Sequence, residues 1–499
     1  MATFNLIRNS RVFMTTNVNG NGIVQEGTPC TANNSQELAV LDGFSFSQAS
    51  TADTITISEA GTSPVRGQRS FNTALNPVEF SFSTYIRPRK PATLVTADES
   101  YLWNALFGDA ALNAATSTIT LSETGDDITV TGTAPRYTLT SSSAWATPTE
   151  ATTKSATTMV AGEVFWMKGL VGANASDWNT PFKFVSKSDS AMVVDAITNP
   201  ATALNTTNFT GATFAFVRTP WVAHAAVAAD AAVGNVPYSQ VDSAGSNLNQ
   251  LLKFGLVFTV DNATYIVDNC ALNQASIDFN LEGIAQVNWS GFGTALRKLT
   301  TNVTYSTDAN PVLTGGMTGT ITGKTDSANG KFITNKLSTI ALTSKIGGVG
   351  GTSYNLALTG GNITINNNIN YITPASLGVV NLPIGYFTGT RSITGNVTAY
   401  LRTGTNNTAD LLAQILADSD TTSETKYKLD IDIGGSNNTN RVEVLINGAS
   451  LQVPTVDAQA VMSTTINFTA QGTEALTANN TYDLENTNDI RVRYFGDTA

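Results

Sequence analysis

The sequence predicts an all-β protein with two tandem copies of one β-sandwich or barrel domain, each with one short helix, and a small β-domain inserted into the first copy. Three observations support this fold class. Short segments alternate between apolar and polar residues, the same order of segments occurs twice, and one copy is longer than the other. The 499 residues also exceed one ordinary core, which favours several domains.

Alternating segments predict the strands. The clearest of them are 79–86, 255–260, 276–281, 427–433 and 441–446. Alternation at a period of two places one set of side chains in a core and the other set at the surface, and Gly, Asn and Asp turns bound each segment. We therefore expect half-buried strands at these positions.

Two short helices that resemble each other are expected between the strands. The first is predicted to start at a capping box formed by Thr96 and Glu99, and the second at Thr408. Each continues into an apolar stripe at helical spacing, which is Leu102, Trp103, Leu106 and Phe107 in the first helix and Leu411, Leu412, Ile415 and Leu416 in the second. A strand ending in Tyr, an aliphatic residue and Arg precedes both.

An internal duplication is predicted from similarity between the two halves. Residues 271–294 align without gaps on 450–473, and residues 253–260 align on 428–435. The identities in the first block are Leu272/Leu451, Asp278/Asp457, Asn288/Asn467, Gly293/Gly472 and Thr294/Thr473. These identities are few, but the order of strand, helix, hairpin and paired strands also recurs. Chance similarity between β segments is the alternative.

The spacing of the repeat locates an insertion. Tyr85 and Tyr400 are 315 residues apart, whereas Asn288 and Asn467 are 179 apart, so the first copy has 315 − 179 = 136 additional residues after its helix. We expect an inserted β decoration domain at 112–247. Its expected strands are 163–168, 182–185, 192–195 and 212–217. The first domain then comprises 1–111 with 248–300, the second comprises 336–499, and 301–335 is a polar linker or extended arm.

The composition argues against several classes of partner. Charged residues make up 13% of the chain, about half the usual ~25%. The formal charge is 27 − 38 = −11 and no basic run is present, so we expect no tight binding of nucleic acid. The sequence has neither a signal peptide nor an apolar run of about 18 residues, which predicts a cytosolic product with no membrane partner.

Motifs for catalysis and for nucleotides are incomplete. His224 is the single histidine, and no Gly-x-Ser-x-Gly elbow accompanies it. Cys30 and Cys270 lack metal-ligand spacing and are expected to be reduced packing residues. Residues 319–325 resemble a phosphate-binding loop, but three residues instead of four separate the glycines. Residues 347–351 resemble a dinucleotide motif but lack a βαβ unit.

A calcium loop is also incomplete. Asp430 and Asp432 resemble its first two ligands, but Gly434 stands at the third position and no Glu closes the loop. We expect instead a strand that exposes two carboxylates on one face. The sequence therefore predicts no catalytic, cofactor-binding or metal-binding residues, no cofactor and no enzyme activity.

Four segments resemble bacteriophage tail tube proteins. They are 37–48, 64–72, 77–88 and 276–293. The resemblance covers the first copy best, and the second copy is recognised through its likeness to the first. It implies two tandem tail-tube domains. In this family, each domain has one flanking helix, and six domains form a ring whose joined sheets make an inner barrel.

The resemblance implies a structural virion protein. Rings would stack into the tail tube that conducts genomic DNA during ejection, and the DNA would pass through the lumen without specific binding. The implied partners are the chain itself and the tape measure, sheath, baseplate and tail terminator proteins, with assembly in the host bacterial cytoplasm. The duplication departs from six chains per ring and predicts three chains in a pseudo-hexamer. The insertion resembles decorating domains on the outer face of some tubes, chiefly at 162–169.

Two other classes of protein remain open. A phage fibre or surface adhesin shares the Thr-, Asn- and Gly-rich β composition, although fibres usually contain many short repeats. An enzyme with a carboxylate pair in a cleft is the second alternative. Stacked rings in negative stain would support the tube, whereas isolated globules or thin fibres would not.

Overall fold

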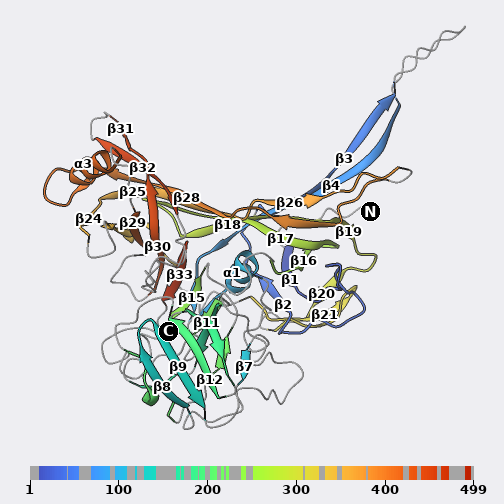
Figure 1. Ribbon diagram of the computed structural model, residues 1–499. Coiled ribbons are helices and arrows are strands. Elements are labelled where there is room, and N and C mark those ends of the chain that lie inside the picture. The colour runs from blue at the N-terminus through green and yellow to red at the C-terminus, as the bar shows by residue number, and fades with distance from the viewer. Residues whose placement is uncertain are drawn as a thin grey trace, which may run out of the picture.

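The structure is a computed structural model in which strands dominate, and this confirms the all-β fold class. It describes residues 10–41, 43–55, 69–89, 96–108, 118–120, 128–141, 164–168, 170–172, 181–188, 190–196, 203–210, 215–217, 221–223, 238–242, 251–306, 310–324, 332–345, 351–377, 380–419, 426–434, 440–457, 462–470 and 489–495. Within these residues the strands form one large sheet, one seven-stranded sheet and three smaller ones (Figure 1). The five alternating segments predicted from the sequence lie in strands except for their end residues Ile86 and Leu281. The segment 255–260 is buried on both faces, not on one as predicted.

Two sets of elements, which we call the first half and the second half, supply all strands of the large sheet except β14 (Trp221–Ala223) and β15 (Tyr238–Asp242), together with the helices and the separate β26–β27 sheet. The first half consists of β1 (Ser10–Thr15), β2 (Ser35–Leu38), β3 (Ser45–Ile55), β4 (Arg69–Tyr85), α1 (Ser100–Phe107), β16 (Phe254–Val260), β17 (Ala263–Asn280), β18 (Gln286–Gly293) and β19 (Ala295–Lys298). The second half contains β23 (Thr339–Lys345), β24 (Ser353–Asn355), β25 (Leu358–Asn366), β26 (Ile369–Ile372), β27 (Gly385–Thr388), β28 (Ser392–Tyr400), α3 (Thr408–Ser419), β29 (Lys426–Ile433), β30 (Arg441–Leu451), β31 (Thr455–Asp457), β32 (Ser463–Ala470) and β33 (Arg491–Phe495).

The strand pairings of the two halves correspond, which confirms the predicted duplication. β1 pairs with β2 and β16, as β23 pairs with β24 and β29. The β16–β17 ladder shifts register between Phe254 and Leu256, and the β29–β30 ladder shifts between Tyr427 and Leu429. A bulge at the same place in both ladders is a specific feature of the fold. The shared bulge aligns Phe254 with Tyr427, whereas the alignment expected from the sequence pairs Phe254 with Leu429, two residues further on.

The ungapped alignment of 271–294 on 450–473 is wrong in its last strand. Asp278 faces Gln286 in the first half, and Asp457 faces Ser463 in the second. The offsets are 457 − 278 = 179 and 463 − 286 = 177, so the second hairpin is two residues shorter. A shift of two residues keeps every side chain on the same face of the strand, so the apolar pattern could not reveal it.

Eight antiparallel strands form one continuous layer across the two halves. Their order is β3–β4–β18–β17–β25–β28–β32–β31. In Figure 1 this layer runs as an arch, with the β3–β4 hairpin extending from one end and α3 and β31 at the other. Buried side chains of both halves, among them Phe80, Trp289, Ile431 and Tyr494, form a common core beneath it.

The two helices lie where the sequence places them, but the first one starts later than expected. α1 begins at Ser100 after Glu99, which makes no side-chain capping hydrogen bond. The predicted capping box is therefore wrong. Thr96 instead belongs to β6 (Thr96–Ala97), which pairs with β5 (Pro88–Arg89). Because the helix starts only at Ser100, Thr96 lies outside its first turn and cannot cap it. α3 begins at Thr408 as predicted, with Asp410 accepting a hydrogen bond from the Asn406 amide at 2.9 Å.

The inserted strands form a separate seven-stranded antiparallel sheet with its own core. They are β7 (Thr118–Thr120), β8 (Ile128–Thr133), β9 (Arg136–Ser141), β10 (Val164–Lys168), β11 (Pro181–Lys187), β12 (Ala191–Ala196) and β13 (Ala215–Val217). The described residues of the four expected strands lie within this set, whereas 163 and 212–214 fall outside the described residues. A one-turn helix, η6 (Thr206–Asn208), adjoins them. In contrast, β14 (Trp221–Ala223) and β15 (Tyr238–Asp242) join the large sheet through β33.

Residues 301–335, expected to be a linker or arm, are folded where the structure describes them. β20 (Val303–Tyr305), β21 (Val312–Gly315) and β22 (Gly319–Thr320) form a three-stranded sheet, and η7 (Asn335–Leu337) follows. Leu313, Met317 and Ile321 are buried against Phe13 and Val257 of the first half. The apolar residues are spaced widely among Thr and Gly residues, so the sequence pattern suggested a polar segment.

Candidate functional site

The two halves meet at a β-joint, which we define as the pairing of β17 residues 274–280 with β25 residues 360–366. Gln274 faces Asn366 and Asn280 faces Gly360, with every residue between them in antiparallel register. The joint therefore continues one sheet into the other without an exposed edge between them.

A ladder of polar side chains crosses the joint on the face away from the core. Asn288 accepts a hydrogen bond from the Ser83 hydroxyl at 2.7 Å and donates one to the Asp278 carboxylate at 3.0 Å. Asn362, on the other side of the joint, donates to Ser276 at 2.8 Å and also to Asp278. Four strands, β4, β18, β17 and β25, are thus tied together by side chains as well as by backbone.

This polar face is almost uncharged along the eight-stranded layer. Buried apolar side chains alternate with half-buried or exposed polar ones along much of β18, β32 and the second half of β4, as in Phe80, Ser81 and Phe82 of β4. The polar residues include Ser83, Asn288, Ser290, Gln274, Ser276, Asn362, Thr364, Asn396, Thr398, Thr465 and Asn467. Glu79 and Asp278 are acidic. Among the described positions of this face, outside the tip of the β3–β4 hairpin, none is Lys or Arg.

The layer ends in two edges that no described strand covers. β3 pairs with β4 on one side, and β31 pairs with β32 on one side. β3 corresponds to β25 of the second half, and β31 corresponds to the end of β17 in the first half. These two counterparts pair with each other and form the β-joint. Apolar side chains are exposed beside β31, since Val453 is 50% and Val456 is 36% accessible.

The β26–β27 hairpin of the second half packs beside the joint on the first half. Ile369 is buried with Leu251 and Ala271, and the Tyr371 hydroxyl lies 2.8 Å from the Asn269 carbonyl oxygen and 2.9 Å from that of Phe292. Burial raises the pKa of Tyr371 above its ordinary value. A group of exposed apolar residues lies on and around this hairpin, namely Ile372, Leu377, Val380, Leu382, Ile384 and Phe387.

A buried polar centre also links the halves. The Tyr494 hydroxyl of β33 donates to the Glu99 carboxylate beside α1 and accepts from the Trp103 indole at 2.9 Å. Burial raises the pKa of Glu99 to about 8, and the neighbouring Asp98 adds to this effect. Asp98 itself forms a buried ion pair with Arg87.

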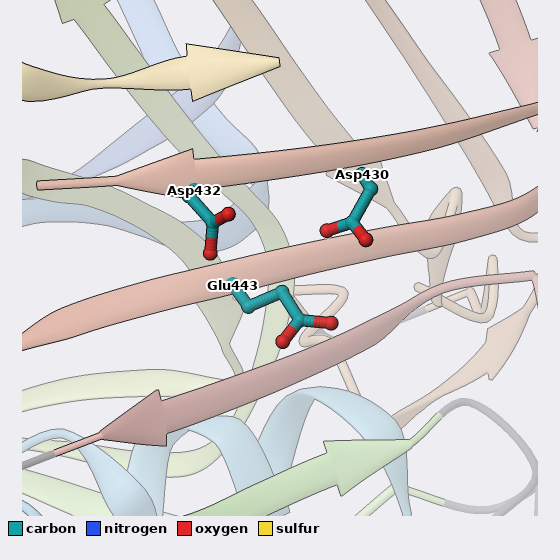
Figure 2. Close-up of side chains that lie close together, drawn as sticks. All are labelled: Asp430, Asp432 and Glu443. Atoms are coloured by element: carbon teal, nitrogen blue, oxygen red, sulfur yellow. The ribbon is translucent and has the colours of Figure 1, made fainter. Parts of the chain in front are cut away.

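The predicted strand with two carboxylates on one face is confirmed, but both carboxylates are half-buried instead of exposed, and a third carboxylate joins them. Figure 2 shows Asp430 and Asp432 of β29 beside Glu443 of β30, with ligand atoms within 4.8 Å of one another. Arg441 lies 3.3 Å from Asp432, and Arg493 contacts Glu443. Burial, together with Glu443 and Asp432, raises the pKa of Asp430 to about 6. Two of the carboxylates therefore have arginine partners, and the cluster is an ion-pair network on a sheet.

The other motifs identified in the sequence fall into structural roles or outside the described residues. Cys30 and Cys270 are buried free cysteines. Gly319 and Thr320 of the phosphate-loop-like segment form β22, and Lys324 lies 3.9 Å from Glu37. His224 lies outside the described residues, as do all positions of 347–351 except Gly351. Among the described residues, no helix is long and apolar enough to cross a membrane.

The β-joint and its two uncovered counterparts were not identified from the sequence. The polar ladder residues follow ordinary strand alternation, and no motif distinguishes a central strand from an edge strand. The available signal was the duplication itself. Because β25 repeats β3, the pairing of β25 with β17 predicts that β3 also has a partner on its free side.

Comparison with known proteins supports the resemblance to tail tube proteins. The chain is 24% identical over 473 residues to tail tube protein pb6 of Escherichia phage T5, and the match covers 93% of this chain and 72% of that protein. No protein-family model matches the chain. The resemblance expected from segments of the first half is thereby confirmed and extends to nearly the whole chain.

Proposed function

We propose that this chain is a structural protein of a phage tail tube, in which rings of three chains stack into the channel that conducts genomic DNA during ejection. The observation that carries the proposal is the eight-stranded layer, which contains one joint within the chain and ends in the two strands that repeat that joint. The similarity to a tail tube protein along 93% of the chain supports the same function.

Ring closure follows from the duplication. Each chain supplies two equivalent units, so three chains supply six and form a pseudo-hexamer. A closed ring covers every sheet edge, whereas an open chain of units leaves one edge exposed at each end. Assembly with copies of itself is thus the primary interaction. By the same resemblance, tape measure, sheath, baseplate and tail terminator proteins are further partners.

The polar face suits a channel wall that does not hold DNA. Three chains at −11 give a ring with a formal charge of −33. Because proteins bind DNA phosphates through clustered Lys and Arg, a face with Glu79 and Asp278 but no described Lys or Arg offers no continuous binding site. DNA would pass along a layer of water instead of binding specifically.

The remaining assignments follow from this role. The protein would act in the virion tail after assembly in the host cytoplasm, without enzyme activity. We propose tail-tube domains at 1–111 with 248–300 and at 336–499, joined through 301–335. Within the insertion at 112–247, the strands between 118 and 217 would form a decoration domain on the outside of the tube, whereas β14 and β15 are part of the large sheet.

Negative-stain microscopy and mass measurement test this proposal. Purified protein should form stacked rings, and one ring should have three times the chain mass of 52.4 kDa. A ring of six times that mass would contradict the trimer but keep the tube. Thin fibres or isolated globules would instead favour a phage fibre, an adhesin or an enzyme.

A further inference from the structure

We infer that neighbouring chains join through β31 of one chain and β3 of the next, in an antiparallel register that pairs Thr455 with Ser47, Val456 with Phe46 and Asp457 with Ser45. This inference rests on the proposed function, because it specifies the contact between chains in the ring. It makes the contact between chains a copy of the β-joint within one chain.

The position of β3 in this contact follows from its match to β25. Ser45 faces Ser81 in the β3–β4 ladder, and Asn362 faces Asn396 in the β25–β28 ladder. Ser81 and Asn396 correspond, because β4 and β28 are related by the offset of 315 found for Tyr85 and Tyr400, which face Gln286 and Ser463. Ser45 therefore corresponds to Asn362, with an offset of 362 − 45 = 317.

The position of β31 follows from its match to the end of β17, where Asp278 corresponds to Asp457. In the β-joint, Ser276 faces Thr364. Applying both offsets gives 276 + 179 = 455 and 364 − 317 = 47, so Thr455 should face Ser47. Pro454 has no N–H group, and for this reason the inferred pairing begins after it.

The uncovered edges have the properties of strands that pair. Ser45 and Ser47 are exposed, and β3 has no charged residue between Phe44 and Gln48 that would oppose pairing. Val456 is exposed in the single chain and would face Phe46. The two edges lie at opposite ends of the molecule in Figure 1, so one chain cannot close on itself and a second copy must supply each partner.

Disulfide cross-linking in assembled tubes tests the register. The double variant Thr455→Cys/Ser47→Cys places cysteines at facing positions, where cross-strand Cβ atoms are about 4.5–5.5 Å apart. After mild oxidation, most of the 52.4 kDa band should shift to covalent multimers on a non-reducing gel. Two control pairs, Thr455→Cys/Phe46→Cys and Thr455→Cys/Ser45→Cys, should stay mainly monomeric, because the first points to the opposite face and the second is diagonal.

A second measurement on the unmodified protein covers the case in which a cysteine variant fails to fold. Amide hydrogen exchange of residues 45–47 and 455–457 should slow on assembly, whereas amides at 276–278 in the β-joint should be protected both before and after assembly. Tubes that form with fast exchange at 45–47, or that cross-link through a control pair, would overturn the inferred register alone. The absence of rings and tubes would overturn the proposed function together with it.

Discussion

At the scale of single residues, Glu99 is a buried carboxyl group that accepts a hydrogen bond from Tyr494. Its second oxygen has no hydrogen-bond partner among the described residues. Burial raises its pKa to about 8, from 4.5 in an exposed chain. The folded protein therefore holds a proton near neutral pH that the unfolded chain has released.

This proton makes stability depend on pH in a defined direction. Between pH 4.5 and about 8 the native state binds more protons than the unfolded state at Glu99, so the free energy of unfolding falls as pH rises. The contribution of Glu99 to the free energy of unfolding is fully present below pH 4.5 and is lost as pH rises through about 8. Each unit by which the folded pKa exceeds the unfolded pKa corresponds to about 1.4 kcal/mol. Asp430, whose pKa is raised to about 6, acts in the same direction over a narrower range.

The variant Glu99→Gln should flatten this dependence. A glutamine stays neutral and keeps an oxygen that can accept the Tyr494 hydrogen bond. Urea midpoints measured at pH 5 and pH 8.5 should differ less for the variant than for the unmodified protein. Glu79→Gln, at an exposed position of β4, is the matched control and should keep the original difference. An unchanged difference in the Glu99 variant would mean that the proton is held by another group.

At the scale of elements, the insertion consists of two structurally different parts. The strands between 118 and 217 pair among themselves and bury Phe165, Phe182 and Met192 in their own core. In contrast, β15 covers one side of β33, whose other side pairs with β30. Removal of the whole range 112–247 would therefore uncover a strand of the second half, although the range is absent from the repeat.

Two deletions should separate these parts. Replacement of 118–217 by a short Gly/Ser linker should leave the fold and tube formation intact, because surface insertions contribute little to the stability of a parent domain. Replacement of 112–247 should lower the unfolding temperature and expose the β33 edge to aggregation. Circular dichroism melts and negative-stain images compare the two variants. Equal behaviour of the two deletions would contradict the role assigned to β15.

The sequence predicted which segments are strands but not which strands are neighbours. Alternation in 79–86 or 427–433 depends on burial of one face, and several strands of the large sheet share that property. Pairing depends on contacts distant in sequence, such as Gln274 with Asn366, and these leave no local pattern. The shift of two residues in β32 was missed because it keeps the same face of the strand buried, and the folded segment 303–320 was missed because its apolar residues are widely spaced.

At the scale of the whole molecule, the polar face of the eight-stranded layer would line the channel. A wall without Lys or Arg should let duplex DNA pass, since binding through released counterions requires clustered cations. Intact tubes should therefore show no binding of duplex DNA at 0.15 M salt. At 0.01 M salt the repulsion should be stronger, because the Debye length grows from about 8 Å to about 30 Å.

Added cations should reverse this behaviour. The triple variant Ser290→Lys, Thr394→Lys and Asn467→Lys places three lysines per chain on β18, β28 and β32, at positions that alternate with buried residues. Its tubes should retain duplex DNA in a sedimentation assay, and retention should fall steeply with added salt. The matched control, with glutamine at the same positions, keeps the longer side chains without the charge and should not bind. DNA binding by unmodified tubes at 0.15 M salt, or no binding by the lysine variant, would show that another surface lines the channel.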